Sequence, residues 1–155
     1  RLRELITYFR SRMDPQGLLH ALQEMTETFF DRTGIALEFA NHVRELDLPV
    51  RREVQVFHIV QEALANVCQH ANARHARLTL ERKGAGYEVT IEDDGVGMAA
   101  DPAGERGESG HYGIAIMRER ASRLGGELTL DSAPGAGTCV RLYFPAMEPQ
   151  TGSGL

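Results

Sequence analysis

Residues 61–71 read QEALANVCQHA and carry three polar residues spaced four apart, Glu62, Asn66 and His70. At about 100° per residue, these three and Gln69 share an arc of a helix about 100° wide. Apolar residues occupy the opposite side of the same helix: Phe57, Val60, Leu64, Val67 and Ala71. The pattern predicts a core-forming amphipathic helix from about Arg51 to Ala71. Two interpretations of its polar row stay open at this point, a solvated face and a face turned toward a polar ligand.

The composition of the chain limits the class of protein. Its 155 residues, 42% of them hydrophobic, suit one compact domain with a core. The net charge of −5 argues against binding to nucleic acid or to an anionic membrane surface. No apolar run approaches the roughly 18 residues of a membrane span. Cys68 and Cys139 lack any metal-ligand or CxxC spacing, so we interpret both as packing residues of a protein in a reducing, cytoplasmic compartment.

Two further helical stripes come before the long helix. Their apolar residues are Leu2, Leu5, Ile6 and Phe9 in the first stripe, and Leu18, Leu22, Met25 and Phe29 in the second. Asp14-Pro15 interrupts the pattern after the first stripe, and Gly34 closes the second as a C-cap. Alternation of apolar and other residues over 35–40 then predicts a strand.

The second half of the chain alternates strands with one helix. We expect strands at about 76–82 and 87–92, a glycine-rich loop over 94–112, and strands at about 127–132 and 138–144. A helix lies between the loop and the last two strands; it carries Ile114, Met117, Ala121 and Leu124, and Gly125-Gly126 ends it. This order predicts a two-layer α/β sandwich with helices on one face of a mixed sheet.

Polar residues share the inward parity of two of these strands. Asp93 shares its parity with Tyr87, Val89 and Ile91, and Thr138 shares its parity with Val140, Leu142 and Phe144. Because an unpaired inward carboxylate is costly, the two side chains predict a shared polar ligand. Asp94 has the opposite parity and can remain in water. Gly95 and Gly97 would let backbone approach the ligand closely. A turn aspartate followed by turn-forming glycines is the alternative.

Residues 110–126 read GHYGIAIMRERASRLGG, in which Gly110 and Gly113 open the predicted helix. The free N–H groups and the dipole of a helix start form a seat for phosphate, although a plain glycine-rich turn is equally compatible with the pattern. The segment is not a Walker loop, because GK[ST] is missing. It is not a Rossmann fingerprint either, because GxGxxG does not follow a strand.

Four motifs in order resemble the ATP-binding domain of sensor histidine kinases. EALANVCQHA resembles the N box, EDDGVG and GHYGIAIMRERASRLGG the two glycine boxes, and PGAGTCVRLYFP the closing strand. The resemblance covers about Arg51 to Pro145 and implies the Bergerat fold of the GHKL superfamily, which includes gyrase B, MutL and the ninety-kilodalton heat-shock chaperones. GHYGIAIMRERA is most similar to nitrate/nitrite sensor kinases of the NarX type.

The resemblance implies an ATP site and a role for each matching residue. Asn66 would hold Mg²⁺ through its amide oxygen. Asp93 would accept a hydrogen bond from the adenine amino group, with Thr138 and the backbone of Gly95 and Gly97 completing that end of the site. His70 would lie beside the base and the ribose. The residues that would line the triphosphate are Gly110, His111, Tyr112, Gly113 and Ile114, and residues 98–112 would form a lid.

Glu62 and Gln69 bear on the chemistry that the resemblance implies. Glu62 matches the acidic residue that activates water in the hydrolysing relatives, and in a kinase it would position Mg²⁺ or assist the phosphoacceptor. Gln69 stands where relatives usually carry lysine, so a positive charge facing the phosphates is missing. A phenylalanine box is also missing from the lid.

The resemblance also implies what lies outside the chain. Kinases of this type phosphorylate a histidine that is followed by Asp or Glu, and none of the six histidines here qualifies: His20, His42, His58, His70, His75 and His111. We expect residues 1–13 to be the end of a dimerisation and phosphotransfer helix, 14–146 the catalytic domain and 147–155 a loose tail.

The implied function is transfer of the ATP γ-phosphoryl group to a histidine on an upstream domain of a homodimeric, membrane-anchored sensor, with a response regulator as the next partner. No nucleic acid or direct membrane contact is expected for this domain. A nucleotide-sensing module that binds ATP without transferring it, and an ATPase or anti-sigma-type kinase on the same fold, remain as alternatives.

Overall fold

The structure is a computed structural model, and it describes residues 17–46, 48–70, 73–96 and 107–146, except the side chains of His70 and residues 107–112. The helices of this part are α2 (Gly17–Thr33), α3 (Val50–His70) and α4 (Gly107–Arg123). The strands are β1 (Ala36–Asn41), β2 (His75–Lys83), β3 (Gly86–Asp93), β4 (Glu127–Ser132) and β5 (Thr138–Pro145). Each agrees with a predicted element to within a few residues, except at the start of α4. The predicted segments 1–13 and 147–155 lie outside the described residues.

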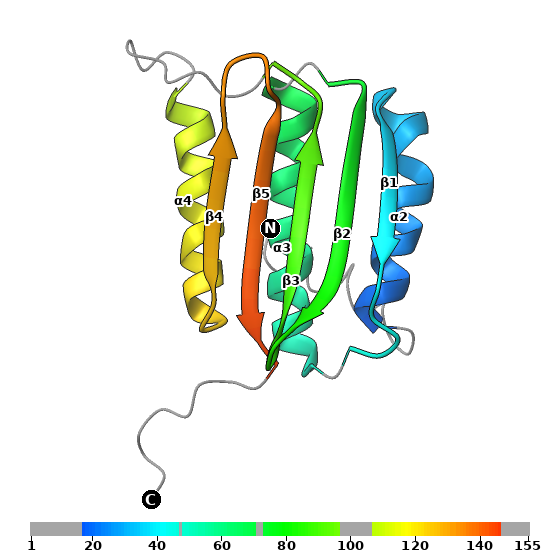
Figure 1. Cartoon of the computed structure of the whole chain (residues 1–155), viewed down its shortest axis with the longest axis vertical. Coiled ribbons are helices and arrows are strands. Elements are labelled where there is room, and N and C mark those ends of the chain that lie inside the picture. The colour runs from blue at the N-terminus through cyan, green and yellow to red at the C-terminus, as the bar shows by residue number, and fades with distance from the viewer. Residues whose placement is uncertain (1–16, 47, 71–72, 97–106, 147–155) are drawn as a thin grey trace, which may run out of the picture.

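The strands form one mixed sheet in the order β1-β2-β3-β5-β4. β1 pairs with β2 in parallel, and the other neighbours are antiparallel. All three helices cover the same face of this sheet, as Figure 1 shows. The predicted two-layer sandwich with helices on one face of a mixed sheet is therefore confirmed.

The core lies between the sheet and the helices. On β3 the inward residues Tyr87, Val89 and Ile91 are at most 2% exposed, and the predicted apolar side of α3 is buried from Phe57 to Val67. Burying one side chain of this size contributes about 1.5–3 kcal/mol relative to leaving it in water. Because the apolar side of α3 faces the sheet, its polar row faces away from the core centre.

Two charged residues in the first turn of α3 join the other elements together. The Glu53 carboxylate accepts a hydrogen bond from the Leu18 N–H at 3.1 Å and so caps the start of α2. Burial raises the pKa of the Glu53 carboxyl, and the bond from Leu18 offsets part of that rise. The Arg52 guanidinium, only 2% exposed, donates to the carbonyl oxygens of Leu124 and Pro145 at 3.2 and 2.7 Å. The ends of α4 and β5 are thereby held against α3.

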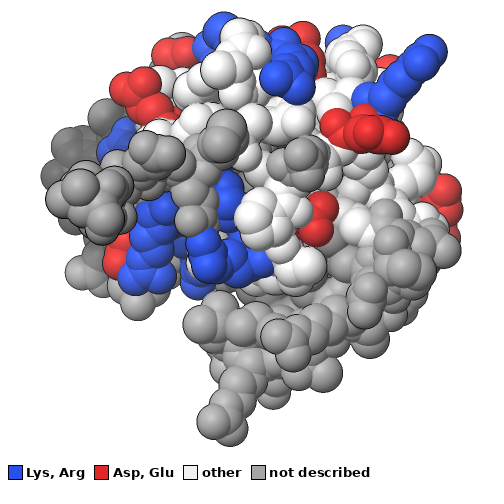
Figure 2. Space-filling model, turned by 90° about the horizontal axis from the view of Figure 1, so that it is seen from below, with Lys and Arg blue, Asp and Glu red and all other residues white. Residues whose placement is uncertain are grey.

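The two ends of the sandwich are formed by different parts of the helices and strands. The upper end in Figure 1 comprises the last residues of α3 and β3 and the first residues of α4 and β5. The lower end holds the start of α2 and the end of β5. Figure 2 views the lower end and shows Lys and Arg side chains gathered on the side of α4. The last turn of that helix contains Arg120 and Arg123, which is the favourable sign of charge at a helix C-terminus.

The structure also bears on the predicted C-cap at Gly34, on the two cysteines and on the expected lack of a membrane span. Gly34 has φ 76° and its N–H donates to the carbonyl oxygen of Phe30 at 2.7 Å, so the predicted C-cap of α2 is confirmed. Cys68 is exposed and Cys139 half-buried, and both thiols are free. The interpretation as packing residues is wrong for Cys68, because its place on α3 lies outside the buried stripe. Among the described residues, no helix is long and apolar enough to cross a membrane.

Candidate functional site

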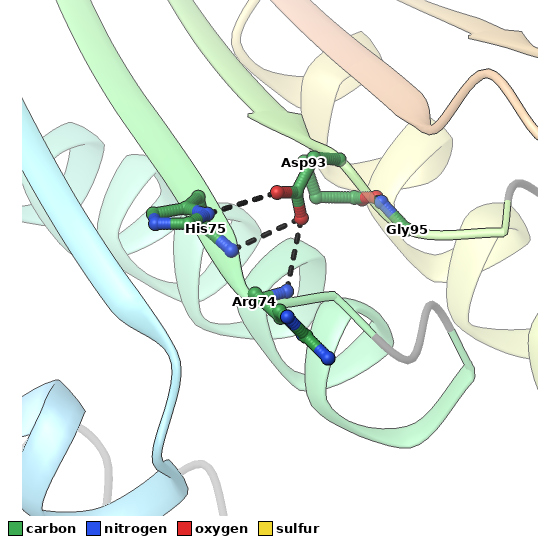
Figure 3. Close-up of polar contacts among 5 residues, drawn as sticks. Arg74, His75, Asp93 and Gly95 are labelled. Atoms are coloured by element: carbon green, nitrogen blue, oxygen red, sulfur yellow. Dashed lines mark hydrogen bonds and ion pairs between the residues drawn. The ribbon is translucent and has the colours of Figure 1, made fainter.

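Asp93 and Thr138 stand opposite each other where β3 and β5 meet the upper end. Both side chains are half-buried, and the Thr138 hydroxyl lies 3.0 Å from that of Ser132 on β4. The Gly95 N–H donates to Oδ1 of Asp93 at 2.8 Å, and Figure 3 shows these two residues together. Burial raises the pKa of the Asp93 carboxyl, while the N–H groups of Gly95 and Thr138 lower it and the Asp94 charge raises it further. The predicted inward carboxylate is therefore present, with a hydroxyl beside it.

The turn between β4 and β5 packs tightly against this pair. Gly137 has φ 75°, and a β-carbon at this position would collide with the carbonyl oxygen of Asp93. An open hollow of about 410 Å³ adjoins the pair, and its lining includes Asp93 and Thr138 together with the outward-facing residues Glu92, Asp131 and Cys139. Both residues of the pair are half-buried rather than sealed in the core.

Asp94 has a structural role that the sequence alone does not reveal. It is exposed, as its parity predicted, and its carboxylate accepts hydrogen bonds from the N–H groups of Arg74 and His75 at 2.9 and 3.0 Å. Its second oxygen lies 2.9 Å from Nδ1 of His75, and the dashed lines in Figure 3 mark these contacts. The bonds from the His75 backbone and ring, followed by that from Arg74, lower the pKa of the Asp94 carboxyl to about 2. Asp94 therefore fixes the start of β2 to the end of β3.

Glu62 and Asn66, from the polar row of α3, face α4. Both are half-buried, and a β-carbon built on Gly113 would lie 3.6 Å from Oδ1 of Asn66 and 3.6 Å from Oε2 of Glu62. The missing side chain at Gly113 thus leaves room directly in front of two hard oxygen donors. Gln69 is exposed, and the side chain of His70 lies outside the described residues. For Glu62 and Asn66, the interpretation as a face turned toward a partner is favoured over a solvated face.

The start of α4 differs from the prediction. The helix begins at Gly107, three residues before Gly110, so Gly113 lies in its second turn and its N–H is not one of the free groups at the helix start. Of the predicted lid, residues 107–112 are helical and 98–106 lie outside the described residues, as does Gly97. Ile114 is 7% exposed and packs in the core, so only its backbone can line a ligand site. The predicted contacts of His111 and Tyr112 concern side chains that are not described.

The oxygen donors at Gly113 are suited to a magnesium ion. Asn66 offers an amide oxygen and Glu62 a carboxylate, and Mg²⁺ usually takes one or two such protein ligands together with waters and substrate phosphates. The described residues contain no cluster of three or more His, Cys, Asp or Glu that could hold a metal ion by themselves. The donor set therefore fits an ion that arrives with a phosphate ligand.

Comparison with known proteins gives this arrangement a family. Residues 51–148 match the family model described as histidine kinase-, DNA gyrase B-, and HSP90-like ATPase. The chain belongs to this family. It is the catalytic ATPase domain of a two-component sensor histidine kinase, and ATP binding goes with the family. The resemblance inferred from the four motifs is thus confirmed.

Individual relatives agree with this assignment. The chain is 37% identical over 148 residues to the nitrate/nitrite sensor protein NarQ of Escherichia coli, covering 95% of this chain and 25% of that protein. It is 32% identical over 136 residues to the histidine-protein kinase/phosphatase DegS of Brevibacillus brevis, covering 88% of this chain and 34% of the relative. The histidine kinase domain of the blue-light activated kinase EL346 from Erythrobacter litoralis superposes with a TM-score of 0.75 at 25% identity, covering 94% of this chain and 73% of that one. The chain thus spans about a quarter to a third of the length of these two curated relatives.

Proposed function

We propose that this domain binds Mg²⁺-ATP across its upper end and transfers the γ-phosphoryl group to a histidine on a separate phosphotransfer domain of its parent protein. The observation that carries the proposal is that two pairs of polar residues lie at the same end of the fold. Asp93 and Thr138 lie at the ends of β3 and β5, and Glu62 and Asn66 lie on the last turns of α3 beside Gly113. An elongated ligand with a polar base at one end and phosphates at the other suits this arrangement.

In this proposal Asp93 recognises the base. Its carboxylate accepts a hydrogen bond from the adenine amino group, and the bond from Gly95 fixes its orientation before the nucleotide arrives. The hydroxyl of Thr138, with the Gly97 backbone, completes that end through water. His70 lies beside the base and the ribose. Because the Asp93 carboxylate is partly buried, its hydrogen bond to the base is stronger than one made in open solvent.

The phosphate end belongs to α3 and the start of α4. Asn66, supported by Glu62, would hold Mg²⁺, and the ion would supply positive charge to neutralise the transferring phosphates. Glu62 also has a carboxylate available to orient the attacking imidazole of the phosphoacceptor. Gly110, His111, Tyr112 and the backbone at Gly113 and Ile114 line the triphosphate. Catalysis is then mostly positioning and charge neutralisation, as in other phosphoryl transfers.

The partners follow from the kind of kinase. The phosphoacceptor histidine lies on a dimerisation domain, so we place this domain in a homodimeric sensor that passes phosphate to a response regulator. Similarity to NarQ and to NarX, which is 29% identical over 143 residues, favours a parent protein of the nitrate/nitrite sensor subfamily. In such a membrane-anchored sensor the domain would lie in the cytoplasm.

A two-component assay tests the proposal. This chain is mixed with radiolabelled ATP, Mg²⁺ and the separately expressed dimerisation domain of its parent protein, and labelled phosphohistidine is measured. We expect label on the dimerisation domain only when both proteins are present, and strong loss of label with Asn66→Ala. ATP binding without any transfer would instead support the nucleotide-sensing alternative, which the neutral, exposed Gln69 favours. Release of inorganic phosphate without phosphohistidine would support the ATPase alternative.

A further inference from the structure

Arg120 connects α4 to α3 far below the upper end. Its Nη1 donates to Oε1 of Gln55 at 2.8 Å, and the contact is partly buried. Gly113 approaches Glu62 higher on the same pair of helices. Seven residues separate Gly113 from Arg120 on α4, and seven separate Gln55 from Glu62 on α3, so each helix rises by about 10.5 Å between the two contacts. Both contacts are therefore compatible with the same antiparallel alignment of α4 on α3.

The residues between these contacts are apolar and do not define that register by themselves. Met117 on α4 and Ile59 on α3 are both 0% exposed. Burial of apolar surface is non-directional, so such side chains tolerate a small axial shift between the helices. A hydrogen bond does not tolerate it, because its energy falls steeply with distance and angle. The bond between Arg120 and Gln55 is thus suited to fix the axial position of α4.

The surroundings of Arg120 make a shift costly. Its Nε and the Nδ1 of His58, one turn above Gln55 on α3, are buried and have no hydrogen-bond partner among the described residues. Burial, and then the Arg120 charge, lower the pKa of His58, which favours the neutral form of the ring. Burial also lowers the pKa of the Arg120 guanidinium, while the carboxylates of Glu119 and Glu62 act in the opposite direction. If this partly buried guanidinium lost Gln55, a second of its donors would have no protein partner.

We propose that Arg120 and Gln55 form a positioning pair that sets the axial register of α4 on α3 and so holds Gly113 in front of the oxygens of Glu62 and Asn66. The proposal rests on the proposed function, since it takes these two residues as the phosphate end of the ATP site. Arg120 acts through the helix and does not touch the nucleotide. The pair therefore affects binding of the phosphates and leaves binding of the base, at Asp93 and Thr138, unchanged.

The test compares two ligands on matched variants of this chain. Calorimetry measures the dissociation constants of Mg²⁺-ATP and of adenosine, which has no phosphates. Gln55→Leu and Arg120→Ala should each weaken Mg²⁺-ATP binding by roughly tenfold and change adenosine binding by less than about twofold. The double variant should lose no more than either single variant, because both remove the same contact. Gln55→Glu should keep wild-type affinity, because a carboxylate accepts from the guanidinium at least as well.

Arg123→Ala is the matched control. Arg123 lies three residues further on the same helix, is exposed, and pairs with Glu119 at 2.9 Å on the surface. Its removal should leave both affinities at their wild-type values. Thermal unfolding of every variant distinguishes a variant that does not fold from one in which only the helix register is lost. If Arg120→Ala does not fold, Gln55→Leu and Gln55→Glu still test the positioning pair.

The outcomes separate this inference from the proposed function. A wild-type chain that does not bind Mg²⁺-ATP contradicts the proposed function itself. If the wild type binds, three results would each overturn the positioning pair: wild-type affinity in Gln55→Leu, equal losses for both ligands, or additive losses in the double variant. A selective loss for Mg²⁺-ATP that Gln55→Glu does not show would support it.

Discussion

Asp93 of β3 and Thr138 of β5 are direct partners across the sheet, and both direct polar side chains to the upper end. Their pairing joins two residues that lie 45 positions apart in the chain. The pairing of the two strands therefore brings a partly buried carboxylate and a hydroxyl together, and the Gly95 N–H then orients the carboxylate. In the proposed function, recognition of the base therefore rests on two hydrogen-bonded strands of the sheet.

Asp93→Asn should abolish the preference for adenine. The amide offers one acceptor oxygen and presents donors toward the adenine amino group, so affinity for ATP should fall by roughly ten- to a hundredfold. Titration with ATP and GTP measures the preference. Glu92→Gln is the control, because Glu92 is the exposed neighbour with outward parity. Equal adenine-nucleotide affinity in wild type and Asp93→Asn would refute the role given to Asp93.

Asp94 should make the stability of the domain depend on pH in the acid range. Its folded-state pKa of about 2 lies below its ordinary value of 3.8. A carboxyl with a lowered pKa stabilises the fold above its unfolded-state pKa, and that contribution is lost as pH falls from about 4 through about 2. Asp94→Asn should flatten this part of the profile, measured as urea midpoints between pH 2 and 5. Glu127→Gln, an exposed acid at the lower end of β4, should keep the wild-type profile.

Gly113→Ala should raise the stability of the domain and weaken its binding of nucleotide. Alanine is favoured over glycine inside a helix by about 1 kcal/mol, and its β-carbon would meet its neighbours at ordinary contact distances of 3.6 Å. The same methyl group would occupy the space in front of Glu62 and Asn66, so Mg²⁺-ATP should bind roughly three- to tenfold more weakly. Ala115→Gly, on the exposed side of α4, should lower stability without changing affinity. Unchanged affinity in Gly113→Ala would place the phosphates elsewhere.

Gln69→Lys should tighten binding of ATP by about 1 kcal/mol, because a charged donor makes a stronger hydrogen bond to phosphate than a neutral amide. The gain should shrink as salt rises and should be absent for adenosine. Gln23→Lys adds the same charge to α2 and serves as the control. Calorimetry showing the same change for ATP and adenosine, or none for either, would remove Gln69 from the site. Arg118, also exposed on α4, would then be the next cation to test.

The chain alone should not phosphorylate itself. None of its six histidines precedes Asp or Glu, which is the local sequence expected around the phosphoacceptor. Incubation with radiolabelled ATP and Mg²⁺ should therefore leave no acid-labile, base-stable label on the protein. Label on any of these histidines would contradict the assignment of the phosphoacceptor to another domain.

The features that the sequence predicted correctly depend on local periodicity. Two-residue alternation in β3 placed Asp93 inward, and the helical period of α3 separated Glu62 and Asn66 from the buried stripe. Both patterns repeat over several residues, so a single exception does not hide them. The fold followed from the order of such elements.

The features that the sequence did not predict depend on contacts between distant segments or on ambiguous residues. The bonds of Asp94 to Arg74 and His75 require the register of β2 against β3. The bond between Arg120 and Gln55 joins residues 65 positions apart in sequence and requires the packing of α4 on α3. The start of α4 was placed three residues late, because glycine can stand inside a helix as well as at its start.

The described chain enters the sandwich at Gly17 and leaves it at Pro145, both at the lower end, whereas Asp93 and Gly113 belong to the opposite half. A segment joined at Gly17 or Pro145 is therefore attached at the end opposite Asp93 and Gly113. Under the proposed function, a partner fused to either of these ends would therefore be attached away from the edge that meets ATP and the phosphoacceptor.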